Sequence, residues 1–308
     1  MAERLRVAVL AGGPSAEHDV SLMSAAAVLA ALPLDRYEPL PIVIGRDGSW
    51  ASELRADVVF PVLHGPFGED GTLQGHLETL GLPYVGCGVL ASAIAMDKVA
   101  MRRAFTAEGL PVTPAVSFSR NEVMDVGGLD WPMYVKPASL GSSIGITRAT
   151  TVAELHSGVD QAFGHGRVVL VEQGVDAREL VCGVLGGYDA PRTSPVGEIK
   201  VGGDWLDYET KYFSEADNVA IPADLPPEVA DQVRALSLRA FRAIGGYGLA
   251  RVDFLYEHGT GHLYVLEINT MPGFTPRSVY ARAWAHAGLP YPELLSRLID
   301  LALERKNA

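Results

Sequence analysis

The sequence has 308 residues, of which 48% are hydrophobic and 20% are charged, a composition typical of a folded globular protein with two or three domains. Lys and Arg number 25 against 37 for Asp and Glu, so the formal net charge is −12, and no basic run offsets it. Nucleic acid is bound through an excess of basic side chains, so this charge argues against nucleic acid as a partner.

The cysteines and the apolar runs exclude other classes. Cys87 and Cys182 lie far apart and outside any C-x-x-C spacing, so the sequence predicts neither a disulfide framework nor a zinc site. The apolar run at 7–11 is shorter than a signal-peptide core, and no stretch approaches a membrane-spanning length. We therefore expect a cytoplasmic protein without a membrane partner.

Strands and helices alternate in the first part of the chain. Short apolar runs predict strands at 5–11, 37–44 and 56–63. Stretches rich in Ala and Leu predict helices at 15–32 and 72–80. This alternation indicates a parallel sheet covered by helices.

A helix that ends at Gly109 is followed by two prolines, which suggests a domain boundary nearby. The next segment reads as a small α+β unit, with strands at 133–137 and 167–173, a glycine-rich stretch at 138–146 and a helix at 151–162. From about residue 177 the pattern changes to strands at 179–186 and 194–200, a polar stretch at 202–218, a helix at 227–244, a hairpin at 250–269 and short helices at 280–287 and 291–303.

The hairpin places four polar side chains on one face. If its turn is centred on residue 260, Asp253 faces Glu267 and Arg251 faces Asn269. Two facing carboxylates require a proton or a cation between them, and hard oxygen donors without His or Cys favour Mg²⁺ or Mn²⁺. The alternative is a buried salt-bridge cluster in which Arg251 alone neutralises both acids.

Two lysines are candidate phosphate ligands. Lys136 precedes the glycine-rich stretch, whose backbone N–H groups could approach phosphate oxygens, although a plain hairpin turn fits that stretch as well. Lys98 lies near a helix start, where a solvated surface charge is the alternative. Glu172 and Glu179 could accept hydrogen bonds from adenine and ribose, or could be exposed acids at strand ends. Walker A and G-x-G-x-x-G motifs are missing, which argues against a nicotinamide enzyme.

Two long motifs, HGPFGEDGTLQG (64–75) and LEINTMPGFT (266–275), resemble those of the D-alanine:D-alanine ligases in the ATP-grasp superfamily. LAGGPSAEHDVSL, AMDK, VKPASLGSSIG, YETKYFS and ARVDF extend the resemblance over nearly the whole chain. It implies a three-domain fold of α/β and α+β type. An N-terminal parallel-sheet domain (1–97) would precede central (98–178) and C-terminal (179–308) domains that sandwich ATP.

The resemblance also implies a two-step reaction for peptidoglycan synthesis. ATP phosphorylates the carboxylate of a first D-alanine, and the amine of a second D-alanine attacks the acyl phosphate to form the dipeptide. The implied cofactors are Mg²⁺ or Mn²⁺, with two ions per site, and the implied assembly is a homodimer.

Residue roles follow from the matched motifs. Glu17 matches the acid that binds the first substrate's ammonium, although an acid there could equally support a helix N-terminus, and His64 matches a histidine beside that substrate. Glu17, Ser142 and Tyr212 would form a hydrogen-bonded triad that closes the site, with Tyr212 on a lid. Arg251 would stabilise charge on the attacked carbonyl. The implied ATP ligands are Lys98, Lys136, Ser143, Glu172, Val175, Glu179 and Lys211, the implied metal ligands are Asp253, Glu267 and Asn269, and the implied ligands of the second D-alanine are Gly273 and Ser278.

Two positions bear on specificity. Gln173 stands where many family members have a lysine, a departure from the family pattern that bears on the adenine contacts. Tyr212 favours an amine as second substrate, because related ligases that make D-alanyl-D-lactate tend to have phenylalanine there. The competing functions are a ligase for another pair such as D-alanine and D-serine, a nucleotide-binding module without turnover, and a kinase that stops at the acyl phosphate. The amino-acid sites implied at Glu17 and Ser278 disfavour the kinase.

Overall fold

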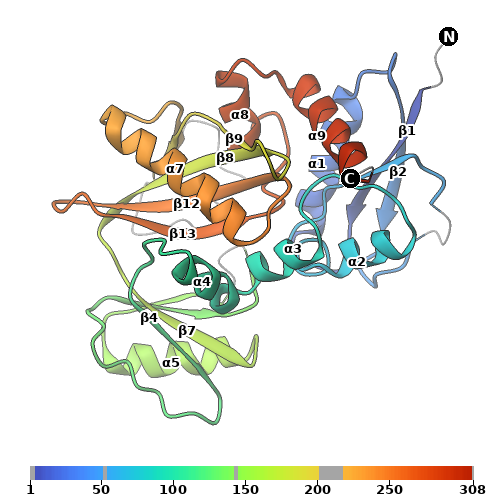
Figure 1. Ribbon diagram of the computed structural model, residues 1–308. Helices are drawn as coiled ribbons and strands as arrows, with labels where there is room; N and C mark the ends of the chain where they lie inside the picture. The colour runs from blue at the N-terminus through green and yellow to red at the C-terminus, as the bar shows by residue number, and fades with distance from the viewer. Residues whose placement is uncertain (1–3, 51–53, 142–144, 201–217, 307–308) are drawn as a thin grey trace.

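The computed structural model describes residues 4–50, 54–141, 145–200 and 218–306 (Figure 1). Its N-terminal part is built on a three-stranded parallel sheet with strand order β2-β1-β3. The strands are β1 (Leu5–Gly12), β2 (Tyr37–Ile44) and β3 (Val58–Pro61). The predicted parallel sheet is therefore confirmed.

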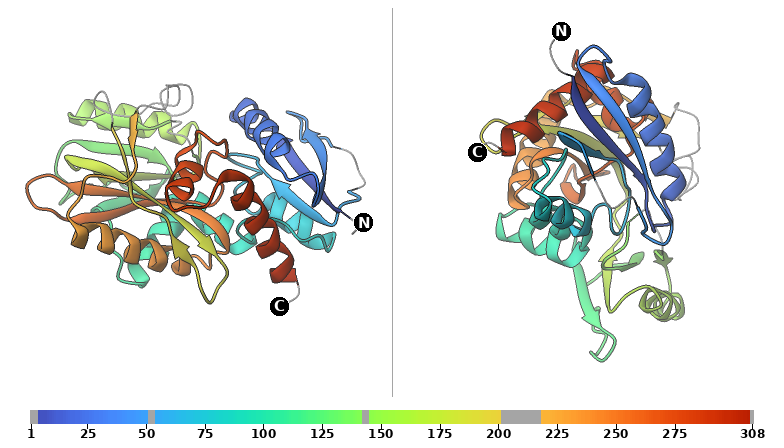
Figure 2. Two further views of the ribbon diagram at one scale, coloured as in Figure 1. Left: turned by 90° about the horizontal axis from the view of Figure 1, so that it is seen from above. Right: turned by 90° about the vertical axis from the view of Figure 1, so that its right-hand side faces the viewer.

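Helices cover both faces of this sheet, which explains why β3 is buried along its whole length. Alternate residues of β1 point to opposite faces. Val7 and Val9 belong to one apolar cluster with residues of α1 (His18–Ala31) and of the C-terminal helix α9 (Tyr291–Lys306), whereas Leu10 belongs to a cluster with residues of α2 (Thr72–Thr79). Both views in Figure 2 show α9, in red, beside the blue N-terminal segment. The last helix of the chain thus completes the core of the first sheet.

The helices α3 (Val89–Met96) and α4 (Lys98–Ala107) lead to a second, antiparallel sheet with strand order β4-β7-β5-β6. Helix α5 packs on one face of this sheet through Leu155 and Val159. The predicted α+β unit is confirmed, although the sequence did not predict β4 and β6 within it or α3 before it. The bounds are β4 (Ala115–Ser119), β5 (Met133–Pro137), β6 (Thr147–Ala149), α5 (Val152–Phe163) and β7 (Val168–Gln173).

The third sheet is antiparallel, with strand order β11-β10-β8-β12-β13 and with β9 paired to β8. Helix α7 covers one face through Leu236 and Phe241, and α8 covers the other through Tyr280. The bounds are β8 (Ala177–Gly186), β9 (Arg192–Thr193), β10 (Gly197–Ile199), β11 (Val219–Ala220), α7 (Pro227–Ala243), β12 (Gly248–Glu257), β13 (Leu263–Asn269) and α8 (Val279–His286).

One of the two predicted domain boundaries falls between secondary-structure elements, and the other falls inside a strand. The boundary after residue 97 coincides with the junction of α3 and α4, whereas the boundary after residue 178 falls inside β8. Among the described residues, every helix is too short or too polar to cross a lipid bilayer.

Candidate active site

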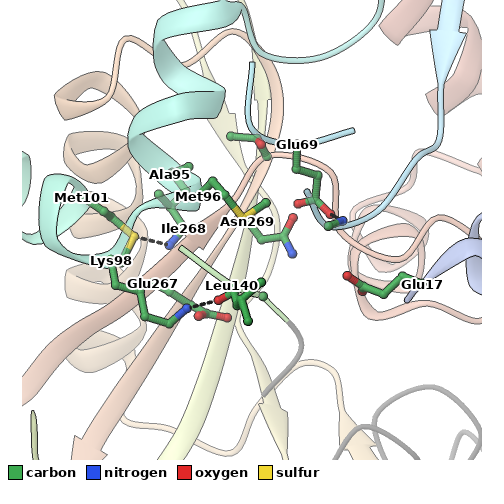
Figure 3. Close-up of a pocket in the computed structure, with 13 residues that line it drawn as sticks. Glu17, Glu69, Ala95, Met96, Lys98, Met101, Leu140, Glu267, Ile268 and Asn269 are labelled. Atoms are coloured by element: carbon green, nitrogen blue, oxygen red, sulfur yellow. Dashed lines mark hydrogen bonds between the residues drawn. The ribbon is translucent and has the colours of Figure 1, made fainter. Parts of the chain in front are cut away.

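One pocket gathers residues from the N-terminal, central and C-terminal parts of the chain (Figure 3). It has a volume of about 530 Å³, which includes space open to solvent. Glu17 lies on one side, and Lys98, Glu267 and Asn269 lie on the other. Four predicted site residues from three distant segments therefore meet around one space.

The position of Glu17 depends on Gly65. Gly65 has a φ of +77°, and a Cβ atom added there would lie 2.6 Å from Oε2 of Glu17. Ser15 ties the two loops together, since its hydroxyl accepts from the Glu17 backbone N–H at 3.1 Å and donates to the His64 carbonyl at 2.6 Å. Glu17 is the N-cap residue of α1, but its side chain makes no capping hydrogen bond, so any support that it gives to the helix N-terminus is electrostatic.

His64 lies behind the pocket wall rather than in it, because its side chain is buried while its neighbour Gly65 lines the pocket. Nδ1 is 3.0 Å from the Met271 carbonyl oxygen, an acceptor, so this nitrogen carries the proton. Nε2 is 3.0 Å from the Ser24 hydroxyl. Burial lowers the pKa of His64, an effect that the Glu17 carboxylate opposes. The neutral imidazole thus links the loop after β3 to the loop after β13.

The hairpin pairing was predicted correctly, since Arg251 pairs with Asn269 and Asp253 pairs with Glu267. The assumed turn centre was wrong. The register shifts after Asp253, so that Phe254 pairs with Val265, and this bulge brings the two carboxylates opposite each other. Bulges of this kind often re-aim side chains beside active sites.

The four side chains of this face form an ion pair and a candidate metal site. Arg251 donates to both oxygens of Asp253, at 2.6 and 2.7 Å, as the salt-bridge interpretation expects. Oδ1 of Asn269 accepts from the Met271 N–H at 2.9 Å and keeps a second lone pair. The oxygens of Asp253, Glu267 and Asn269 fit a hard cation, with Asp253 shared between that cation and Arg251. No group of three His, Cys, Asp or Glu side chains suited to a metal occurs in the described part of the chain, and the predicted set contains only two carboxylates.

The glycine-rich stretch is anchored to the start of α4. Oδ1 of Asp97 accepts from the N–H groups of Val99 and Ala100, at 3.0 and 2.9 Å, and Oδ2 accepts from the Ser139 hydroxyl at 3.0 Å. The Lys98 ammonium donates to the Leu140 carbonyl, so it is not the solvated surface charge of the alternative interpretation. The stretch does join the antiparallel neighbours β5 and β6, as the plain-hairpin interpretation expects, and it also reaches the pocket through Leu140 and Gly141.

Glu172 is the centre of a buried ionic cluster and is 3% exposed, so the interpretation as an exposed strand-end acid is wrong. Arg102 donates to it at 2.7 Å, and Lys136 and the Thr113 hydroxyl also donate to it. Burial works to raise the pKa of the Glu172 carboxyl, but Lys136 and Arg102 outweigh it and hold that pKa below its usual value. Glu179, on β8, is half-buried and does not line the pocket.

The remaining predicted residues lie outside the pocket lining or outside the described part of the chain. Ser278 is the N-cap residue of α8, and its hydroxyl accepts from the Thr275 N–H at 3.0 Å. The Gln173 side chain accepts from the Asp130 N–H at 3.0 Å. Ser142, Ser143, Lys211 and Tyr212 lie outside the described residues. Those that the structure describes but does not place in the pocket lining are His64, Lys136, Glu172, Val175, Glu179, Arg251, Asp253, Gly273 and Ser278.

Sequence reasoning missed two charged residues. Glu69 lines the pocket and accepts from the Gly65 N–H at 2.7 Å, and its place inside the 64–75 motif was a usable signal. Arg102 contacts Glu172 and follows Lys98 by four residues, which puts both side chains on one side of α4. A helical projection of that segment would have shown two basic residues on one face.

Comparison with known proteins gives matches over nearly the whole chain. Residues 6–55 and 51–87 match the family described as D-ala D-ala ligase N-terminus, and residues 105–300 match D-ala D-ala ligase C-terminus. The D-alanine–D-alanine ligase of Solibacter usitatus is 45% identical over 314 residues, which cover 98% of this chain and 96% of the relative. That of Deinococcus radiodurans is 43% identical over 337 residues, with 98% and 99% coverage.

Solved structures with a similar fold are also ligases of this kind. The D-alanine–D-alanine ligase of Coxiella burnetii has a TM-score of 0.87 at 31% identity and covers 99% of this chain and 96% of its own. The VanG D-Ala:D-Ser ligase of Enterococcus faecalis has a TM-score of 0.87 at 32% identity, with 97% and 100% coverage. The Bacillus anthracis D-alanine–D-alanine ligase complexed with ATP has a TM-score of 0.83 at 29% identity, with 98% and 99% coverage. The predicted ATP-grasp fold is thereby confirmed.

Proposed function

Because this chain belongs to the D-alanine–D-alanine ligase family, we propose that it uses ATP to join two D-alanines into D-alanyl-D-alanine for peptidoglycan precursors. The observation that carries the proposal is the pocket shared by Glu17, Lys98, Glu267 and Asn269. A ligand for an ammonium group, a ligand for phosphate and hard oxygen donors are the groups that phosphoryl transfer to an amino-acid carboxylate needs.

In the first step a carboxylate oxygen of the first D-alanine takes the γ-phosphoryl group of ATP, which gives an acyl phosphate and ADP. Glu17 would hold the ammonium of that D-alanine, and Lys98 would neutralise phosphate charge as it develops. Asp253, Glu267 and Asn269 would hold Mg²⁺ or Mn²⁺, with two ions in the site. The bound metal would supply further neutralisation of the phosphate oxygens.

In the second step the neutral amine of the second D-alanine attacks the acyl carbon. The C–N bond forms, the amine nitrogen loses a proton, and inorganic phosphate leaves. Arg251, which is buried beside the metal donors, would stabilise the negative charge on the carbonyl oxygen. The assignments of Ser142 and Tyr212 to site closure, and of Gly273 and Ser278 to the second carboxylate, remain part of this proposal.

The test is phosphate release from Mg-ATP with D-alanine, with L-alanine as the control. We expect release only with the D-isomer, formation of D-alanyl-D-alanine by mass spectrometry, and loss of both on chelation of the metal. Equal rates with the two isomers would contradict the proposal. Recovery of phosphate release when Mg²⁺ or Mn²⁺ is added back to the chelated protein would support the metal requirement.

D-serine is the second candidate for the acceptor, since the fold is equally similar to a D-Ala:D-Ser ligase. The curated relatives at 45% and 43% identity favour D-alanine. Competition between labelled D-alanine and D-serine would decide, and we expect the dialanine product to dominate.

The family resemblance also carries two proposals about the whole protein. We propose that it works as a homodimer in the cytoplasm, where the ATP that it consumes is made. Light scattering coupled to size exclusion should give twice the 32.8 kDa of one chain, and a monomer at working concentration would contradict the homodimer.

A further inference from the structure

The cluster around Glu172 contains two cations for one carboxylate. The side chains of Glu172, Arg102 and Lys136 are 4%, 10% and 13% exposed, so all three charges are largely withdrawn from water. Charges are costly to bury without a partner, and one cation would already balance one carboxylate. We therefore expect the second cation to have a function besides neutralising Glu172.

The two cations are held differently. Arg102 donates to Glu172 at 2.7 Å, to the Thr113 hydroxyl at 3.2 Å and also to the Thr113 carbonyl, so its planar guanidinium is fixed on three acceptors. Lys136 donates to the other oxygen of Glu172 from the end of β5, directly before the glycine-rich stretch. The Lys136 ammonium sits on a flexible side chain and can rotate away from Glu172. The planar Arg102 guanidinium, held by three acceptors, stays in contact with Glu172.

We propose that Arg102 is a positioning residue that keeps the Glu172 charge balanced, so that Lys136 can turn its ammonium toward a nucleotide phosphate. This rests on the proposed function, since it takes ATP as the ligand. Without Arg102, Lys136 would be the counter-ion of a buried carboxylate, and its departure would leave that carboxylate with the Thr113 hydroxyl alone. ATP would then have to compete with Glu172 for Lys136.

A variant without the Arg102 charge should also make ATP binding depend on pH. Once Lys136 leaves, the uncompensated Glu172 carboxyl would take up a proton, so the complex would form more readily in acid. Among the described residues, the groups that face Glu172 from neighbouring elements are Lys136 and Tyr134 on β5, Arg102 on α4 and Ala115 on β4. Arg102 and Lys136 are the charged ones.

The experiment compares Arg102→Gln and Arg102→Met with Arg102→Lys, in the full chain. The control is Arg103→Gln, at an exposed position next to Arg102 on α4. Equilibrium binding of Mg-ATP is measured at pH 6 and pH 8 and divided by the wild-type value at each pH. For both neutral variants we expect ATP affinity to fall by about tenfold or more at pH 8 and to recover partly at pH 6. Arg102→Lys and Arg103→Gln should stay close to the wild type at both values.

Unchanged ATP affinity in the neutral variants would overturn the proposal, and so would a loss that is the same at pH 6 and pH 8, since a structural role predicts no proton uptake. If one neutral variant does not fold by circular dichroism, the other carries the test. If neither folds, Arg102→Lys decides, because a retained charge that fails to preserve ATP affinity contradicts the proposal and one that preserves it supports it. Wild-type ATP binding without D-alanine-dependent phosphate release would overturn the proposed function and leave the role of Arg102 standing.

Discussion

At the scale of single residues, the site depends on side chains whose neighbours fix them in place. Glu17 is the clearest case, since its carboxylate occupies the space that any side chain at position 65 would need. Its backbone is tied through Ser15 to the loop that carries Gly65. A change at a residue without functional groups should therefore alter substrate binding.

Gly65→Ala tests this dependence. The added Cβ would displace the Glu17 carboxylate, and the positive φ would add strain of about 1–2 kcal/mol. We expect KM for the first D-alanine to rise about tenfold or more, measured by phosphate release. The matched control is Gly48→Ala, where φ is +79° but nothing lies within 4 Å of the added Cβ. Equal effects of the two substitutions on KM would contradict the role given to Glu17.

The buried His64 should make the fold sensitive to acid. Burial lowers the pKa of His64 below its ordinary value of 6.5, so the unfolded chain binds the proton more readily than the folded one. The contribution of this group to stability is complete above pH 6.5 and is lost as pH falls toward the folded-state pKa, by up to about 1.4 kcal/mol per pH unit. Urea unfolding at pH 5 and pH 7.5 should show a larger loss for the wild type than for His64→Gln. Identical losses would mean that His64 is not the titrating group.

At the scale of elements, α4 connects the pocket to the ionic cluster around Glu172. Its cap Asp97 holds the glycine-rich stretch, its first residue Lys98 lines the pocket, and Arg102 on the next turn reaches Glu172. The helix thus connects the cluster around Glu172, where we propose that the nucleotide binds, to the pocket as one rigid unit.

Substitutions at the cap should separate stability from ATP binding. Asp97→Ala removes the bonds to two backbone N–H groups and to Ser139, which we expect to cost about 0.5–2 kcal/mol and to raise KM for ATP. Ser139→Ala leaves the cap intact, so it should raise KM for ATP without lowering the melting temperature. Asp97→Asn keeps a cap acceptor and should retain most of the stability. If Ser139→Ala lowered the melting temperature as much as Asp97→Ala, the two effects would not be separable.

The sequence predicted elements better than it predicted their assembly. Hairpin alternation gave the facing pair Asp253 and Glu267, but a bulge leaves little trace in a sequence, so the turn centre was misplaced. Two-residue strands such as β9 and β11 are too short to show any periodicity. The cluster of Arg102 with Glu172 joins residues 70 positions apart, a contact that no local pattern contains.

At the scale of the whole molecule, the C-terminal helix packs against the N-terminal part of the chain. Helix α9 packs on the N-terminal sheet, and Arg305 near its end donates to the carbonyls of Gly86 and Tyr84, at 2.8 and 2.9 Å. The same guanidinium lies 4.1 Å from the centre of the Tyr84 ring and 5.2 Å from that of Tyr247. One side chain thus bridges segments that the sequence separates by more than half its length.

Removal of this bridge should destabilise the molecule. For Arg305→Met we expect a loss of about 2–3 kcal/mol, from two hydrogen bonds to a charged donor and the ring contacts. The control is Arg297→Met on the same helix, whose partner Glu304 is 53% exposed and whose loss should cost less than about 1 kcal/mol. Chemical denaturation of both variants measures the difference. Equal losses would show that Arg305 acts only as a surface charge.

The position of α9 also sets the order in which the protein can be completed during its synthesis. Domains usually fold as they leave the ribosome, with the N-terminal one first. Here the N-terminal sheet shares its core with residues 291–306, which are translated long after it. Part of the apolar cluster that contains Val7 and Val9 therefore stays uncovered until α9 has been translated. For a nascent chain this is the interval in which a chaperone has an apolar surface to hold.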